Sequence, residues 1–261
     1  ALKSYLTFPQ ICYNKVMNSG MWNPWHGCHK YSEGCLNCYM FSFDKQRDVD
    51  SNFVHKTSDF DLPIKKDRYH NFKVKDGSHL SVCLTSDFFI EEADVWRSDV
   101  WDFIKARGNV KFSLFTKRVY RIAQCLPSDW GDSYENVEIV LTVENQKRAD
   151  ERLPIFLALP LKHRVLTVSP MLEKIDLSKY LKTGLIEEVY CSGENYKNSR
   201  VCDYDWVKNL SEQCKSANVK FIFFATGSKF RKDGKIYYIP YKKGKEQAIK
   251  ANLNFIPKEK V

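Results

Sequence analysis

Three cysteines near the start of the chain are the residues whose types and spacing most clearly indicate chemistry. Cys28, Cys35 and Cys38 follow a Cys-x6-Cys-x2-Cys spacing within residues 22–39. A [4Fe–4S] cluster normally takes one thiolate per iron, so three thiolates would leave one iron open to an external molecule. If that molecule is S-adenosylmethionine, its amino and carboxylate groups would chelate the iron. One electron would then cleave the sulfonium and give a 5′-deoxyadenosyl radical.

Zinc is an alternative occupant of the same three thiols. Three cysteines and one histidine form an ordinary tetrahedral zinc site, and His26 or His29 would complete it. The six-residue gap between the first two cysteines also departs from the Cys-x3-Cys-x2-Cys spacing of the commonest radical enzymes. Spacing alone leaves iron–sulfur and zinc both open.

Composition predicts a folded protein whose partner is a polyanion. The chain is 43% hydrophobic, and its length of 261 residues suits one α/β barrel. Nine cysteines, an odd number, argue against a disulfide framework, and no apolar run is long enough to span a membrane. We therefore expect a cytoplasmic protein with no membrane contact. Net charge is +9, and the lysine-rich residues 229–260 suggest nucleic acid, with a solvated basic tail as the equal alternative.

Short apolar segments alternate with helical patterns along most of the chain. Strands are predicted at residues 80–85, 111–116, 137–143, 164–168, 188–191 and 219–224, with 22–26 as a possible first strand. Helices are predicted at residues 93–106, 119–126, 146–157, 174–181 and 205–217, and one could open at 39–45. With no sign of hairpin pairs, this order predicts parallel βα units in a complete or partial (β/α) barrel. A doubly wound open sheet is the structural alternative.

Polar residues follow several of these strands, at the end where parallel α/β folds place their ligand sites. The groups are Thr85-Ser86-Asp87, Thr116-Lys117-Arg118, Thr142 with Glu144-Asn145, Ser169, and Ser192-Gly193-Glu194-Asn195. Any one of them is also a good helix N-cap. Their occurrence after five strands predicts one polar mouth, with the three-cysteine loop on its rim.

These blocks, in this order, resemble a phage- and bacterium-associated family of unknown function that carries a three-cysteine motif and is regarded as radical-S-adenosylmethionine-like. The resemblance runs along nearly the whole chain. It is carried by Trp22, Asn23, Pro24, Gly27, Cys28, Gly34, Cys35, Cys38 and Tyr39, then by Ser86-Asp87-Phe88, Thr116-Lys117-Arg118, Glu144-Asn145-Gln146, Gly193-Glu194, Trp206, Cys214 and Asp233-Gly234-Lys235.

The resemblance implies a radical S-adenosylmethionine enzyme with a TIM-barrel-like fold. Cys28, Cys35 and Cys38 would ligate a [4Fe–4S] cluster. S-adenosylmethionine would be the second cofactor, and a flavodoxin or ferredoxin would donate the electron. Apart from the resemblance, the chemistry of the residues after the strands gives the other candidates. The residues expected to bind the cofactors are Thr85, Ser86, Asp87, Lys117, Arg118 and Asn145. Glu144 and Glu194 are the expected catalytic residues, which would bind ribose hydroxyls or act in proton transfer.

Departures from the family pattern fall on the expected substrate side. The family commonly reads Gly-Gly-Glu-Ser after the sixth strand, where this chain has Ser192-Gly193-Glu194-Asn195 after Cys191. Ser169 stands where an acidic or amide residue often precedes proline, and Ala225-Thr226 replaces a polar pair. An inactive family member and a zinc-stabilised nucleic-acid-binding module therefore remain alternatives to an enzyme that modifies a nucleic acid or nucleotide.

The sequence predicts three regions. Residues 1–20 form an N-terminal extension, residues 21–228 form the barrel with the cysteine loop, and residues 229–261 form a basic C-terminal extension packed on the barrel.

Overall fold

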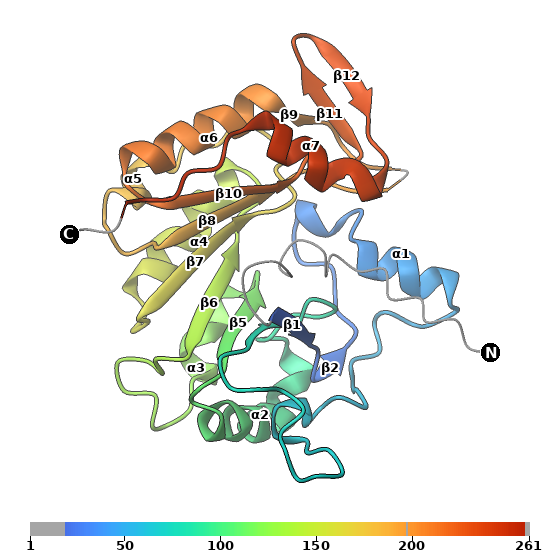
Figure 1. The fold of residues 1–261 in the computed structure, drawn as a ribbon, viewed down its shortest axis with the longest axis vertical. Coiled ribbons are helices and arrows are strands. Elements are labelled where there is room, and N and C mark those ends of the chain that lie inside the picture. The colour runs from blue at the N-terminus through green and yellow to red at the C-terminus, as the bar shows by residue number, and fades with distance from the viewer. Residues whose placement is uncertain (1–18, 197, 259–261) are drawn as a thin grey trace.

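Seven parallel strands form one curled sheet in a computed structural model that describes residues 19–196 and 198–258 (Figure 1). Their order is β1 (Ser19–Trp22), β4 (His79–Val82), β5 (Lys111–Thr116), β6 (Val137–Thr142), β7 (His163–Val168), β8 (Glu188–Ser192) and β10 (Lys220–Ala225). In the described residues β1 and β10 are the two edges and do not pair with each other. The predicted α/β class and parallel strands are confirmed, and the sheet is a partial barrel.

Helices cover the outer side of this curl, one after most strands (Figure 1). They are α2 (Asp94–Ala106), α3 (Ile122–Cys125), α4 (Gln146–Ala158), α5 (Ser178–Leu181) and α6 (Tyr204–Ser216). Helix α6 illustrates why they form. Asp203 caps its start by accepting a hydrogen bond from the Asp205 N–H (2.8 Å), and Val207, Leu210 and Cys214 recur at helical spacing on its buried face.

The two faces of the sheet differ in chemistry. Phe112 and Leu114 of β5 belong to the hydrophobic core, while Ser113 between them donates a hydrogen bond to the Glu138 carboxylate on β6. Strand side chains alternate between faces, so the face opposite the core carries these polar groups, together with the buried Val140 and Val165. Glu138 also pairs with Lys111 at 2.7 Å. All six residues of β6 are nonetheless buried, as is usual for the middle of a parallel sheet.

Two predictions about the strands were wrong. The first sheet strand is residues 19–22 rather than 22–26, because the chain leaves the sheet at Pro24, which has no N–H to donate. Beyond it β2 (Trp25–His26) pairs antiparallel with β3 (His55–Lys56). The absence of hairpin pairs was also wrong. β11 (Lys229–Lys232) and β12 (Lys235–Tyr238) form an antiparallel hairpin.

Several smaller elements complete the described chain. They are α1 (Tyr39–Gln46), β9 (Cys202–Asp203), α7 (Gly244–Ala251), and the short 3-10 helices η2 (Glu33–Cys35), η3 (Leu62–Ile64), η4 (Glu91–Ala93), η5 (Val119–Arg121) and η6 (Tyr241–Lys243). Helix α7 packs against β10, and Phe255 pairs with Phe221 at that sheet edge. The predicted extension 1–20 lies outside the described residues except for Ser19 and Gly20 in β1.

None of the helices in the described part of the chain is both long enough and apolar enough to cross a membrane.

Candidate functional site

The three cysteines lie on one loop, residues 27–38, between β2 and α1. Cys35 is buried, and Cys28 and Cys38 are half-buried. The Cys28 N–H donates to the Ser51 carbonyl (2.8 Å), and the Cys38 N–H donates to the Cys35 carbonyl (3.3 Å). At the start of the loop Gly27 has a φ of +98°, and a Cβ there would lie 2.5 Å from a backbone oxygen. Only glycine fits this close approach, so the loop path is fixed from its first residue.

Side chains from the carboxyl ends of the strands bind this loop. Ser86, after β4, donates to the Gly27 carbonyl (2.5 Å). Arg118, after β5, donates to the His29 carbonyl (3.4 Å) and lies 3.9 Å from Cys28 Sγ. The predicted groups that follow β4 and β5 therefore meet the cysteine loop, as expected from a shared sheet end.

Asp87 organises the connection between these two strands. Its buried carboxylate accepts hydrogen bonds from Thr116 Oγ1 (2.7 Å) and the Lys117 N–H (2.8 Å), and it pairs with Arg118 at 3.1 Å. The Asp87 carboxylate therefore fixes the positions of Thr116, Lys117 and Arg118. Thr85 is held by its N–H, which donates to Asn23 Oδ1 (3.1 Å).

Glu144, after β6, is fully buried and joins the loop to α4. Its carboxylate accepts a hydrogen bond from Ser32 Oγ and pairs with Arg152 at 2.8 Å. Asn145 caps α4 through the Arg148 N–H (2.9 Å), so it has the structural role that its residue type also allowed. Glu144 is therefore placed to position the loop.

Glu194, after β8, binds the far end of the same loop. Its carboxylate accepts from Asn37 Nδ2 (2.9 Å) and pairs with Arg200 at 2.6 Å. Burial raises the pKa of Glu194, but the hydrogen bonds from Arg200 and Asn37 outweigh it and lower that pKa overall. Glu194 thus stays ionised and holds Asn37 between two of the cysteines.

Two cationic groups beside the thiols lack a full set of partners. Within the described residues no acceptor lies in hydrogen-bond range of Lys117 Nζ, and the buried Arg152 Nη2 has none either. Burial would lower the pKa of Lys117, but Cys35, Glu144 and Cys38 raise it. Burial likewise raises the pKa of Cys35, but Lys117 together with backbone hydrogen bonds from Tyr31 and Ser32 outweighs burial, so that pKa is lowered. The ammonium group of Lys117 therefore faces the thiols and can still accept an anionic partner.

The other two thiols are held in their protonated form in this structure. Burial and the Asp87 carboxylate raise the pKa of Cys28 to about 12, despite the nearby Arg118. Burial also raises the pKa of Cys38. A cation bound at these sulfurs would reverse this preference, because metal coordination deprotonates thiols.

The candidate ligands for zinc do not converge. His26 Nε2 lies 3.0 Å from the Asp44 carboxylate, and His29 Nε2 contacts Glu92, so both rings bind carboxylates. No group of three or more His, Cys, Asp or Glu side chains in the described residues is arranged to hold a metal ion. A four-iron cluster differs from a single ion because each thiolate binds a different iron and the sulfurs need not meet at one point. Three thiols are the donor type that an iron–sulfur cluster takes, and neither histidine is placed in the described residues as a fourth zinc ligand.

Ser32, Asn37 and Arg152 are site residues that the sequence analysis missed. Ser32 and Asn37 lie between the cysteines, where a loop sequence indicates no particular partner. Arg152 is in the middle of a helical pattern, where arginine is usually a surface residue, yet it is 1% exposed. Only the fold reveals that it faces Glu144.

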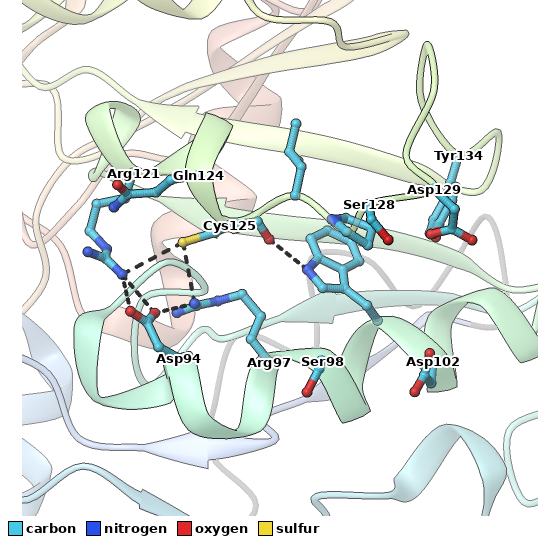
Figure 2. Close-up of a pocket in the computed structure, with 13 residues that line it drawn as sticks. Asp94, Arg97, Ser98, Asp102, Arg121, Gln124, Cys125, Ser128, Asp129 and Tyr134 are labelled. Carbon is cyan, nitrogen blue, oxygen red and sulfur yellow. Dashed lines mark hydrogen bonds and ion pairs between the residues drawn. The ribbon is translucent and has the colours of Figure 1, made fainter.

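Away from the cysteine loop, a hollow lies between α2 and the segment that follows β5 (Figure 2). Its volume is about 670 Å³, and none of the predicted site residues lines it. Arg97 and Arg121 both pair with Asp94 there, and Cys125 Sγ lies 3.3 Å from Arg97. The Asp94 carboxylate therefore neutralises both arginines that line the hollow.

A family model described as "Protein of unknown function (DUF5131)" matches residues 16–253, which include the cysteine loop and every strand of the curled sheet. The chain belongs to this family. In this DUF5131 protein the match ends two residues beyond α7 and so covers the hairpin as well. No curated protein and no solved structure matches the chain.

Proposed function

We propose that this protein is a radical S-adenosylmethionine enzyme that modifies a nucleic acid or nucleotide. The observation that carries the proposal is the arrangement of the cysteine loop. Three thiols lie over the carboxyl ends of a curled parallel sheet, beside the unpartnered Lys117 ammonium and Arg152 Nη2. The radical-S-adenosylmethionine-like character of the fold remains part of this proposal.

Cys28, Cys35 and Cys38 would hold a [4Fe–4S] cluster. When bound, that cluster would supply an electron from a flavodoxin- or ferredoxin-like donor to S-adenosylmethionine and give a 5′-deoxyadenosyl radical. The chain's own residues would provide charge and position. Lys117 would pair with the cofactor carboxylate, since its ammonium group has no hydrogen-bond partner in the described residues. Arg118 is less available for this role because Asp87 already pairs with it.

Glu144 and Glu194 have a different role in this proposal from the catalytic one expected from their position after the strands. Both carboxylates hold residues of the cysteine loop, Ser32 and Asn37 respectively, and both are paired with arginines. They fix the loop against two different strands. We therefore propose them as positioning residues for the three thiols.

The test is to purify the protein without oxygen and to measure its iron, sulfide and zinc content. Dithionite and S-adenosylmethionine are then added, and 5′-deoxyadenosine is quantified. We expect bound iron and cleavage in the wild type, and loss of both in Cys35→Ala. Cys214→Ala is the matched control, because Cys214 is a buried thiol on α6, far from the loop in sequence. Tightly bound zinc with no iron would contradict the proposal and favour a zinc-stabilised binding module.

A second variant tests the role of Lys117. Lys117→Met should weaken S-adenosylmethionine binding by roughly tenfold or more, since a hydrogen bond to a charged group is worth about 1.5–3 kcal/mol. Lys147→Met on α4 is the control for loss of one positive charge. Equal binding in both variants, measured by calorimetry on protein with equal iron content, would remove Lys117 from the cofactor site.

A further inference from the structure

The hairpin of β11 and β12 presents a preformed, exposed surface. Its turn is Asp233-Gly234, with φ values of +50° and +73°, which are the positive values that a tight two-residue hairpin turn needs. All residues from 231 to 238 are exposed. β12 is the edge of a three-stranded sheet whose order is β12-β11-β9. The hairpin therefore has a defined backbone but buries little of its own surface.

Aromatic side chains lie on both faces of this hairpin. Phe230 is buried and packs against Phe223 (ring centroids 5.8 Å apart), which anchors the hairpin to the sheet. Tyr237 pairs across from Phe230, and Tyr238 pairs across from Lys229. Tyr237 is 48% exposed and Tyr238 is 75% exposed. Ile236, also exposed, precedes them on β12, and three consecutive exposed apolar side chains are the kind of surface that another molecule can cover.

The charge of the hairpin is positive and largely unneutralised. Among the described residues, Lys229, Lys232 and Lys235 have no carboxylate partner. Arg231 pairs with Asp203. Asp233 at the turn is the only acidic residue from 229 to 245. Lysines interleaved with exposed tyrosines match a polyphosphate chain that carries aromatic bases.

The hairpin lies at the same end of the sheet as the cysteine loop. β11 begins four residues after β10 ends, at the carboxyl edge of the strands (Figure 1). Beyond β12, Tyr241 stacks on Tyr196 at 5.4 Å, and Tyr196 packs against Phe43 at 5.4 Å. Phe43 belongs to α1, which starts directly after Cys38. A row of aromatic rings thus connects the foot of the hairpin to the helix that follows the cysteine loop.

We infer that this hairpin binds single-stranded nucleic acid, with bases stacked on Tyr237 and Tyr238 and phosphates paired with Lys229, Lys232 and Lys235. A single strand is indicated because its unstacked bases can cover exposed aromatic rings, whereas duplex bases are already stacked. The inference rests on the nucleic-acid part of the proposed function and is independent of the radical chemistry. The row from Tyr241 to Phe43 would lead the bound strand toward the three thiols.

Fluorescence anisotropy tests this inference with the full-length protein and labelled oligonucleotides of about 12 nucleotides, a length within the site size of known single-strand binders. The probes are single-stranded RNA, single-stranded DNA and a duplex of the same sequence, titrated at about 50 to 200 mM salt. We expect the single strands to bind more tightly than the duplex. The comparison of RNA with DNA identifies which of the two the hairpin prefers.

Two hairpin variants separate stacking from charge. Tyr237→Ala with Tyr238→Ala should weaken binding by at least about tenfold, because stacking contributes about 1–3 kcal/mol per base. Lys232→Gln with Lys235→Gln should reduce the slope of log affinity against log salt by about 1.4, or about 0.7 for each lost phosphate contact. Tyr69→Ala is the matched control, because Tyr69 is 66% exposed in the connection between β3 and β4.

The inference is overturned if the hairpin variants bind as the wild type does, if Tyr69→Ala weakens binding as much as they do, or if the duplex binds more tightly. Concentration-dependent self-association that the tyrosine variant abolishes, without nucleic-acid binding, would also overturn it and assign the β12 edge to a second protein chain. Anisotropy needs no iron, so failure here is separable from failure of the proposed function. Cleavage of S-adenosylmethionine without nucleic-acid binding refutes only the hairpin's role. Nucleic-acid binding by a protein that, purified without oxygen, holds no iron and cleaves no S-adenosylmethionine refutes only the radical chemistry.

Discussion

Helix α4 makes two ion pairs beside the cysteine loop, one buried and one exposed, and this difference yields a sharp prediction. Arg152 pairs with Glu144 at 2.8 Å, with both side chains almost completely buried. Arg148, one helical turn earlier, pairs with Glu33 of the loop, also at 2.8 Å, but Glu33 is 41% exposed. The same helix therefore offers a buried connection to the loop and an exposed control.

Arg152→Met should destabilise the protein far more than Arg148→Met. Removal of Arg152 leaves the buried Glu144 carboxylate without its ion-pair partner, which typically costs about 3–5 kcal/mol. Removal of Arg148 leaves Glu33 in contact with water, and exposed pairs contribute about 1 kcal/mol or less. For a chain of this length each kcal/mol shifts Tm by about 2–4 °C, so Arg152→Met should lower Tm by about 6 °C or more.

Urea unfolding of the two single variants, of Glu144→Gln and of the double variant Arg152→Met/Glu144→Gln measures these free energies. The double variant should be more stable than the sum of its two single changes implies, because it leaves no isolated charge. Our reasoning is refuted if Arg152→Met costs no more than Arg148→Met, or if the two changes in the double variant simply add. Either result would mean that water reaches Glu144.

Two further predictions concern the sheet and the strand ends. Burial would raise the pKa of Glu138, but His79 and Lys111 lower it from 4.5 to about 2. Its contribution to stability is therefore present above pH 4.5 and is lost as pH falls from 4.5 toward 2, so Glu138→Gln should reduce the change in urea stability across that range. Gly227→Ala should lower the free energy of unfolding by about 2–4 kcal/mol, because φ is +77° and the added Cβ would lie 2.6 Å from a backbone oxygen. Gly184→Ala is the control: φ is +71° but the added Cβ meets no atom, so the same urea assay should show a loss of only about 1 kcal/mol.

The parallel sheet was predictable because its strands are short apolar runs separated by helical patterns. β5 starts and ends at the predicted residues, and β6 ends one residue before the predicted boundary. The hairpin was not recognised, although Asp233-Gly234 is a strong turn signal, because its strands are rich in lysine and lack the alternation of a half-buried strand. The many lysines in this segment therefore favoured the prediction of a basic tail over that of a hairpin.

The site was predictable as a location but not as a set of contacts. The polar groups after the strands and the cysteine loop do lie at one end of the sheet. The sequence could not show that Glu144 and Glu194 would be bound by Arg152 and Arg200, since these pairs depend on three-dimensional packing. It is this pairing that changes the expected role of both carboxylates from catalysis to positioning.

The contacts after β7, β8 and β10 change how the departures from the resembled family pattern should be understood. Ser169 and Ser192 hydrogen-bond to each other, and the Gly193 N–H donates to the Ala225 carbonyl at 3.0 Å. The departures are therefore neighbours and not scattered losses. The resembled pattern has a larger side chain at 169 beside a glycine at 192, whereas this chain has two small hydroxyl residues, so total volume is nearly conserved. In this structure Ser169 and Ser192 thus bind each other, and their positions are coupled rather than independent gaps in a pattern.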